Sequence, residues 1–149
     1  MPGPLAGVLD TQSITVPTPI QAATLPDSLA GRDVLGRGRT GSGKTLAFVL
    51  PLVARLQSSG KRAAPKRPRA LILAPTRELV AQIDATLAPL ATVAGLRTRT
   101  VFGGVGQNPQ VQALRAGVDI LIATPGRLED LIGQGVCDRR GPLLWRLFP

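Results

Sequence analysis

Short apolar runs alternate along the chain with longer segments in which apolar residues recur at helical spacing. Runs of this kind, bounded by turn-forming residues, are typical of buried strands in a parallel sheet. They cover residues 33–35, 70–73 and 118–123, and residues 98–102 look like another strand. A segment with helical character follows each run, over residues 46–57, 75–87, 111–114 and 125–132. The alternation predicts an α/β domain with a parallel sheet and right-handed crossovers.

Prolines and glycines subdivide this pattern. Pro19 is expected to open a short helix at its first turn, followed by a second short helix over 25–30. Pro51 is expected to kink the helix that contains it, and Pro89 to bend or end the next one. Residues 1–13 begin with proline and glycine, and we expect them to be frayed.

A loop rich in glycine, threonine or arginine follows each predicted strand. These loops cover residues 38–45, 75–78, 103–104 and 124–127. In open parallel sheets, ligands bind at the carboxyl ends of the strands. We therefore expect one sheet edge to hold a nucleotide at one place and a second polyanion at others.

Residues 38–45 have the pattern G-x-x-x-x-G-K-T of the phosphate-binding loop. Its glycines let successive N–H groups point at phosphate oxygens, and the following helix presents its positive end to the same anion. Lys44 is the candidate cation for the β- and γ-phosphates, and Thr45 the candidate Mg²⁺ ligand. The nucleotide-binding candidates in the loop are Arg39, Thr40, Gly41, Ser42, Gly43, Lys44 and Thr45.

Gln21 follows a proline-rich turn and is a candidate for adenine recognition. Its amide has one donor and one acceptor group, as does the edge of adenine. The alternative for this residue alone is an exposed glutamine with no ligand.

The net charge of +9 favours a polyanionic partner such as RNA, because arginine supplies all but three of the 18 positive charges. A general bias towards arginine in the source organism is the alternative. The basic stretch 58–69 is expected to be an exposed linker, with transient RNA contact as the second possibility.

Cys137 is the only cysteine and histidine is absent, which excludes an internal disulfide and a four-ligand zinc site. No apolar run is long enough to cross a bilayer, since Arg55 interrupts the best one. These features predict a soluble, cytoplasmic protein without a membrane partner.

Five short strings, in this order, resemble motifs of the DEAD-box family of ATP-dependent RNA helicases. They are residues 17–21 (Q motif), 41–45 (motif I), 75–79 (motif Ia), 102–104 (GG motif) and 124–127 (motif Ib). The resemblance implies an incomplete RecA-like P-loop NTPase domain with a parallel sheet, covering residues 14–133. Its implied ligands are ATP, Mg²⁺ and RNA.

The resemblance also implies residue roles. Gln21 would contact adenine, Lys44 and the loop backbone would hold the phosphates, and Thr45 would bind Mg²⁺. The RNA path would be lined by Thr76, Arg77, Gly104, Thr124 and Arg127. Hydroxyls and guanidinium groups suit the sugar–phosphate backbone and position RNA without distinguishing its sequence. The local alternatives are a surface pair between Arg77 and Glu78 and a simple turn at Pro125.

The chain also departs from the family pattern. Nucleotide hydrolysis needs carboxylates for Mg²⁺ and for water, and the Asp-Glu-Ala-Asp motif that supplies them is absent. The acids after motif Ib are Glu129, Asp130 and Asp138, and none of them ends an apolar strand. Residues 134–149 match nothing in the family, and the second RecA-like domain is missing. No aromatic residue precedes Phe48 to stack on adenine.

We therefore expect a truncated or frame-shifted product of a longer helicase gene, able to bind but with no significant hydrolysis or unwinding of its own. One alternative is a non-catalytic RNA-binding fragment. Others are a nonfunctional truncated product, in which a lost central strand leaves apolar surface uncovered, and an unrelated P-loop kinase. The kinase hypothesis leaves residues 75–79 and 124–127 without a role.

Overall fold

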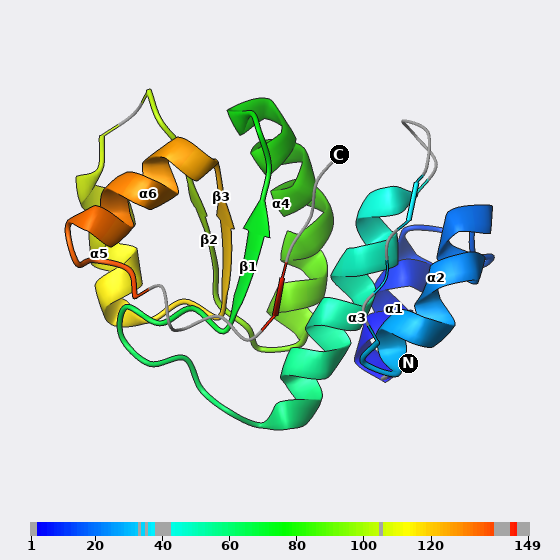
Figure 1. Cartoon of the computed structure of the whole chain (residues 1–149). Coiled ribbons are helices and arrows are strands. Elements are labelled where there is room, and N and C mark those ends of the chain that lie inside the picture. The colour runs from blue at the N-terminus through cyan, green and yellow to red at the C-terminus, as the bar shows by residue number, and fades with distance from the viewer. Residues whose placement is uncertain are drawn as a thin grey trace. The chain divides into compact units, whose positions relative to one another are not determined.

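The computed structural model describes residues 3–32, 34, 36–37, 43–104 and 106–138, together with the backbone of 144–145. The chain forms two compact units. Unit 1 contains residues 1–60 and 86–95, and unit 2 contains residues 61–85 and 96–149. Figure 1 labels the six helices and the first three strands of the described residues.

Unit 1 is helical in its described part. Its elements are α1 (Gly3–Thr11), α2 (Pro19–Leu29), α3 (Lys44–Ser59) and the second half of α4 (Arg77–Val93). Helix α1 stands where we expected a frayed terminus, and Leu5 in it is fully buried. Burial of a leucine contributes roughly 1.5–3 kcal/mol, enough to favour an ordered first helix. The strand expected at 33–35 falls mostly on positions outside the described residues.

Prolines interrupt the helices less than local rules predict. The two short helices expected between Pro19 and residue 30 are one helix, α2, with Pro26 inside it. Helix α3 is continuous through Pro51, and α4 runs past Pro89, so the prediction that Pro89 ends α4 is wrong. An interior proline costs about 3 kcal/mol, but a helix that buries several apolar residues on one face recovers more than that. Helix α3 buries Val49, Leu50 and Val53.

Unit 2 contains the parallel sheet, which confirms the predicted α/β class. Its strands are β1 (Ala70–Leu73), β2 (Thr98–Val101), β3 (Ile120–Ala123) and β4 (Leu144–Trp145). They lie in the order β2-β3-β1-β4, and every pairing is parallel. Strand β4, which pairs with the start of β1, lies within the segment expected to match nothing in the family.

Helices α5 (Asn108–Ala116) and α6 (Pro125–Gly133) cover one face of the sheet (Figure 1). Leu114 of α5 and Leu131 of α6 pack in one buried cluster with Leu121 of β3 and Val101 of β2. All four residues of β3 are buried, as expected for a strand covered on both faces. Among the helices in the described ranges, none has the length and apolarity needed to cross a membrane.

Candidate nucleotide and RNA sites

The strands of unit 2 place three of the predicted functional loops at one edge of the sheet. Leu73, Ala123 and Val101 are aligned across β1, β3 and β2, so these strands end at the same level. The backbone ladder continues one step further, where the Thr124 N–H donates to the Val101 carbonyl at 3.0 Å. The structure therefore brings the loops after residues 73, 101 and 123 together, as the sequence predicts.

Thr76 and Arg77 begin helix α4 at this edge. The Thr76 hydroxyl accepts a hydrogen bond from the Leu79 N–H at 3.2 Å and so caps the helix. Arg77 Nε lies 3.5 Å from Glu78 Oε1, and both side chains are exposed, at 56% and 72%. The local pair that we considered as an alternative is thus present. An exposed pair contributes only about 0–1 kcal/mol and does not prevent Arg77 from contacting a phosphate.

Gly104 lies beside the Arg77 side chain. Its φ of +83° is in the left-handed region that favours glycine. A Cβ atom at this position would come within 3.2 Å of Arg77 Nη1. Glycine at residue 104 therefore lets the turn after β2 and the guanidinium group approach each other closely.

Thr124 and Arg127 begin helix α6 at the same edge. Thr124 is the N-cap residue of α6, and Pro125 occupies its first turn, where proline is favoured. Half-buried Arg127 donates from Nη1 to Gln110 Oε1 at 3.0 Å. Gln110 Nε2 in turn contacts the Phe102 carbonyl at 3.4 Å. Two helix N-termini and two guanidinium groups thus share one edge, an arrangement that attracts an anionic backbone.

In unit 1, Gln21 contacts the end of the phosphate loop. Its Nε2 donates to the Gly43 carbonyl at 3.1 Å, across 22 positions of sequence, and its Oε1 accepts from the Thr18 N–H at 3.0 Å. The side chain is buried, at 4% exposure. The alternative of an exposed glutamine is therefore wrong. The amide instead joins the Pro-Thr-Pro-Ile-Gln segment to the phosphate loop.

Gly43 has the geometry expected where a loop meets an anion. Its φ is +85°, and a Cβ atom there would lie 2.5 Å from Gln21 Nε2 and 2.8 Å from Thr18 Oγ1. The buried Thr18 hydroxyl has no hydrogen-bond partner within the described part of the chain. Helix α3 starts at Lys44 with no side-chain cap among these residues, so its N-terminus can face an anion. These features fit the phosphates of a nucleotide.

The structure describes only some of the other residues predicted for the phosphate loop. Lys44 and Thr45 are half-buried in the first turn of α3. The positions of Arg39, Thr40, Gly41 and Ser42 lie outside the described residues, and their roles stay predictions.

As predicted, none of the three acids after motif Ib lies at the end of a strand. Glu129 and Asp130 are exposed on α6. Asp138 accepts from Arg67 Nε at 3.1 Å, while its N–H donates to the Lys66 carbonyl at 2.8 Å. Asp138 therefore joins the segment after α6 to the loop before β1.

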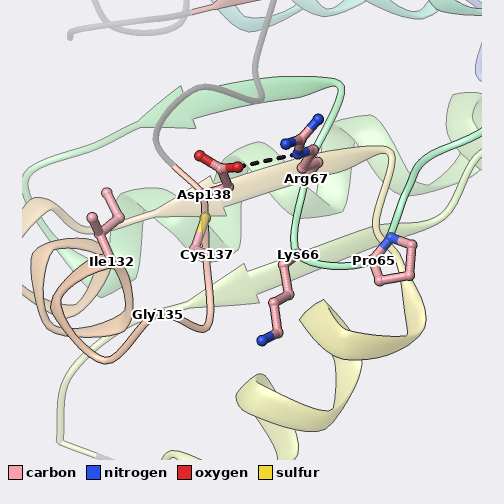
Figure 2. A pocket seen from close by; sticks show the side chains of 7 residues that line it. All are labelled: Pro65, Lys66, Arg67, Ile132, Gly135, Cys137 and Asp138. Atoms are coloured by element: carbon pink, nitrogen blue, oxygen red, sulfur yellow. Dashed lines mark hydrogen bonds and ion pairs between the residues drawn. The ribbon is translucent and has the colours of Figure 1, made fainter.

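A cavity of about 610 Å³ lies beside this contact. Figure 2 shows the residues that line it. Its lining residues come from the loop before β1 and from the end of α6 and the turn after it: Pro65, Lys66, Arg67, Ile132, Gly135, Cys137 and Asp138. Cys137 is not a candidate nucleophile. Burial and then the Asp138 charge raise the pKa of its thiol to about 11, which keeps the thiol protonated at neutral pH.

Sequence reasoning missed two buried polar residues of unit 2. One is Gln110, described above. The other is Asp119, which accepts from Arg69 Nη1 at 3.1 Å and from the Arg97 N–H at 2.8 Å. Asp119 thereby joins the residues that precede all three of β1, β2 and β3. A charged residue beside an apolar run, as in Val118-Asp119-Ile120, is the signal that could have identified it.

A parallel sheet with the motif loops at its strand ends, and a helix that follows a G-x-x-x-x-G-K-T sequence, are typical of the P-loop NTPase class. The family model of the DEAD/DEAH box helicases matches residues 18–144. The chain therefore belongs to the DEAD/DEAH box helicase family.

Individual relatives agree with this assignment. The chain is 51% identical over 122 residues to the ATP-dependent RNA helicase dbp3 of Sclerotinia sclerotiorum. It is 47% identical over 135 residues to the ATP-dependent RNA helicase RhlB of Sodalis glossinidius. A crystal structure of the RNA helicase Prp28 from Chaetomium thermophilum, bound to ADP, is similar with a TM-score of 0.83 and 42% identity, over 92% of this chain.

The chain spans only part of these relatives. The matches cover 82% and 88% of this chain but 20% of the dbp3 sequence and 32% of the RhlB sequence. The match to the Prp28 structure covers 33% of that chain. Over the part that it spans, the chain shares the RecA-like α/β fold of these RNA helicases.

Proposed function

We propose that this chain is the nucleotide- and RNA-binding part of an ATP-dependent RNA helicase, and that the chain by itself binds without sustained hydrolysis. The observation on which the proposal chiefly depends is the contact between Gln21 and Gly43. It joins two family motifs that lie far apart in the sequence, at the end of the phosphate loop. Similarity to ATP-dependent RNA helicases, and to an RNA helicase structure bound to ADP, supports the same assignment.

For the nucleotide, Lys44 and the N–H groups at the start of α3 would hold the phosphates, and Thr45 would bind Mg²⁺. Bound Mg²⁺ supplies charge neutralisation for the phosphate oxygens. Gln21 would contact adenine only by exchanging one of its present hydrogen bonds, because both ends of its amide already have partners. We propose that the Arg39–Ser42 backbone completes this site.

For RNA, the proposed contacts are Thr76, Arg77, Gly104, Thr124 and Arg127, all at one edge of the sheet. Donors of this kind bind phosphate and sugar groups and do not distinguish bases. Hydrolysis requires carboxylates placed at the metal and the attacking water. The acids after motif Ib do not provide them, since Glu129 and Asp130 are exposed on a helix and Asp138 is bonded to Arg67. The single cysteine supports a reducing compartment such as the cytoplasm.

A thermal melt of the full chain with and without Mg·ADP tests the nucleotide part. A ligand present at 100 times its Kd stabilises the folded state by about 2.7 kcal/mol. We expect the wild type to show the corresponding rise in Tm and Lys44→Ala to lose it. Lys61→Ala, the same change in the loop before β1, is the control and should retain the rise. A wild-type melt that is unaffected by Mg·ADP would contradict the proposal.

The arrangement of unit 2 also favours a second candidate, an RNA-binding fragment that does not respond to nucleotide. The proposed RNA contacts all lie within unit 2, whereas the nucleotide contacts lie in unit 1. Salt-dependent RNA binding of equal strength with and without Mg·ATP would support this candidate. RNA binding that Mg·ATP strengthens only while Lys44 is present would reject it.

A further inference from the structure

One buried polar side chain of unit 2 has no role in the function proposed above. Gln110, in the first turns of α5, is 5% exposed. An amide that loses water without gaining hydrogen bonds costs roughly 1–3 kcal/mol. An apolar residue would fill the same position without that cost, as Leu114 does one turn further along α5. The favourable placement of a glutamine here therefore depends on the hydrogen bonds of its amide oxygen and nitrogen.

The two contacts of Gln110 lead to two functional loops. Its Nε2 group lies 3.4 Å from the carbonyl of Phe102, the residue immediately before the Gly103–Gly104 turn. Its Oε1 atom accepts from Arg127 Nη1 at 3.0 Å. Gln110 thus joins the backbone at the end of β2 to a side chain at the start of α6, and both lie at the carboxyl ends of the strands.

A bond of this kind fixes the direction of a guanidinium group. Arginine has a planar fork of donors on a flexible stem, and holding one nitrogen restricts the plane of the fork before a ligand arrives. The entropy of ordering the side chain is then lost on folding and not on RNA binding. The Gln110 acceptor is neutral, so this hydrogen bond does not neutralise the guanidinium charge.

We propose that Gln110 is a positioning residue that orients Arg127 towards an RNA phosphate and links it to the turn that contains Gly104. The inference depends on the proposed RNA-binding function and extends it. Gln110 itself touches no RNA.

Nitrogen-15 NMR of the Arg127 Nε–H group in the full chain tests the orientation without RNA. Gln110→Leu removes the acceptor, and we expect faster motion of the Arg127 side chain and faster exchange of its Nε–H. Gln110→Glu keeps an acceptor oxygen and should keep the group ordered. Gln112→Leu, the same change at an exposed position of α5, is the matched control. Unchanged Arg127 dynamics in Gln110→Leu would overturn the inference.

RNA binding by the same variants tests the functional consequence. Losing one phosphate contact to single-stranded RNA lowers the salt slope of log K by about 0.7. We expect this decrease for Gln110→Leu and for Arg127→Ala, and no further decrease when the two are combined. A purely structural role for Gln110 predicts that its effect persists in the Arg127→Ala background. Gln110→Met, with a flexible apolar side chain, replaces the leucine variant if that variant does not fold.

The outcomes separate the two proposals. If the wild type binds RNA and Gln110→Leu binds with the same affinity and salt slope, only the inference is wrong. If the wild type binds no RNA, the proposed function is wrong for this chain, and the NMR measurement still decides whether Gln110 orders Arg127.

Discussion

Each unit of the chain contains one buried glutamine that makes two hydrogen bonds, and the two residues have different partners. Among the described residues of unit 1, the hydrogen-bond partners of the Gln21 side chain are backbone groups, the Thr18 N–H and the Gly43 carbonyl. In unit 2, Gln110 contacts one backbone carbonyl and the side chain of Arg127. Gln21 thus positions a stretch of main chain, whereas Gln110 positions a charged group.

This difference matches the chemistry proposed for the two ligands. A phosphate loop binds its anion through consecutive backbone N–H groups, so the position of the main chain determines the site. An RNA backbone is bound largely by side chains, so side-chain direction determines that site. The same residue type therefore supports two kinds of anion recognition.

Asp119→Ala should have the largest effect. Asp119 is a further buried polar residue of unit 2, and it joins the starts of three strands, at the end of the sheet opposite the proposed RNA contacts. Its substitution removes the acceptor for Arg69 Nη1 and for the Arg97 N–H, and Arg69 is only 11% exposed. Breaking a buried pair costs about 3–5 kcal/mol. Urea unfolding measures the loss. Asp130→Ala on exposed α6 should change stability by about 0.5 kcal/mol or less, and equal losses would contradict the assignment.

Gly43→Ala should be next and should affect unit 1. The backbone has φ of +85°, and the added Cβ would lie 2.5 Å from Gln21 Nε2, so the bond from Gln21 to the loop must break. We expect a loss of more than about 1 kcal/mol and no rise in Tm with Mg·ADP. Gly60→Ala is the matched control, because its φ is +65° but nothing lies within 4 Å of the added Cβ. If both variants keep the ADP response, the main-chain role of Gln21 is wrong.

Gly104→Ala should have a smaller effect on stability and a measurable one on RNA binding. Its φ is +83°, and the nearest atom to the added Cβ is the flexible end of Arg77, at 3.2 Å. We expect about 1 kcal/mol of destabilisation and weaker RNA binding as the guanidinium moves. Gly135 has a similar φ of +72°, and no atom lies within 4 Å of an added Cβ. Gly135→Ala should therefore lower stability without changing RNA binding. Filter binding at several salt concentrations distinguishes the two. Equal RNA affinity for both variants would show that Arg77 and Gly104 do not act together.

Asp84→Asn should have the smallest effect and should depend on pH. Burial raises the pKa of Asp84, so the folded state binds its proton more tightly than the unfolded state does. The carboxylate therefore disfavours folding above both pKa values, and this penalty disappears as the pH falls below them. We expect Asp84→Asn to raise Tm slightly at pH 7, with a difference that shrinks in acid. A Tm difference between Asp84→Asn and the wild type that grows in acid would contradict a raised pKa for Asp84.

Local sequence signals predicted the sheet of unit 2 well. The segments at 70–73, 98–102 and 118–123 each contain a strand, because all three are short, rich in β-branched or other apolar residues and bounded by turn residues. The loops after these strands also fell at one edge, because parallel strands must end on the same side. The proline rules were less reliable, since burial of an apolar helix face outweighs a single missing hydrogen bond.

Long-range polar contacts could not be predicted in the same way. Gln110 and Arg127 are 17 positions apart, and Asp119 and Arg69 are 50 apart. Neither spacing follows from a helical or strand period, so only the folded sheet brings the partners together. Gln21 was identified by its motif, but its contact with Gly43 was not. The proposed contacts of Gln21 with adenine and of the phosphate loop with nucleotide stay predictions.

The buried thiol of Cys137 gives the natural chain an internal reporter of local opening. It is the only cysteine, it is 5% exposed, and it lies just after α6 in the buried cluster of unit 2. With so little of the residue exposed, reaction with a bulky thiol reagent depends on opening of the surrounding structure, so the labelling rate reports on that opening. Because only one site can react, labelling reports on opening near the C-terminal end of α6.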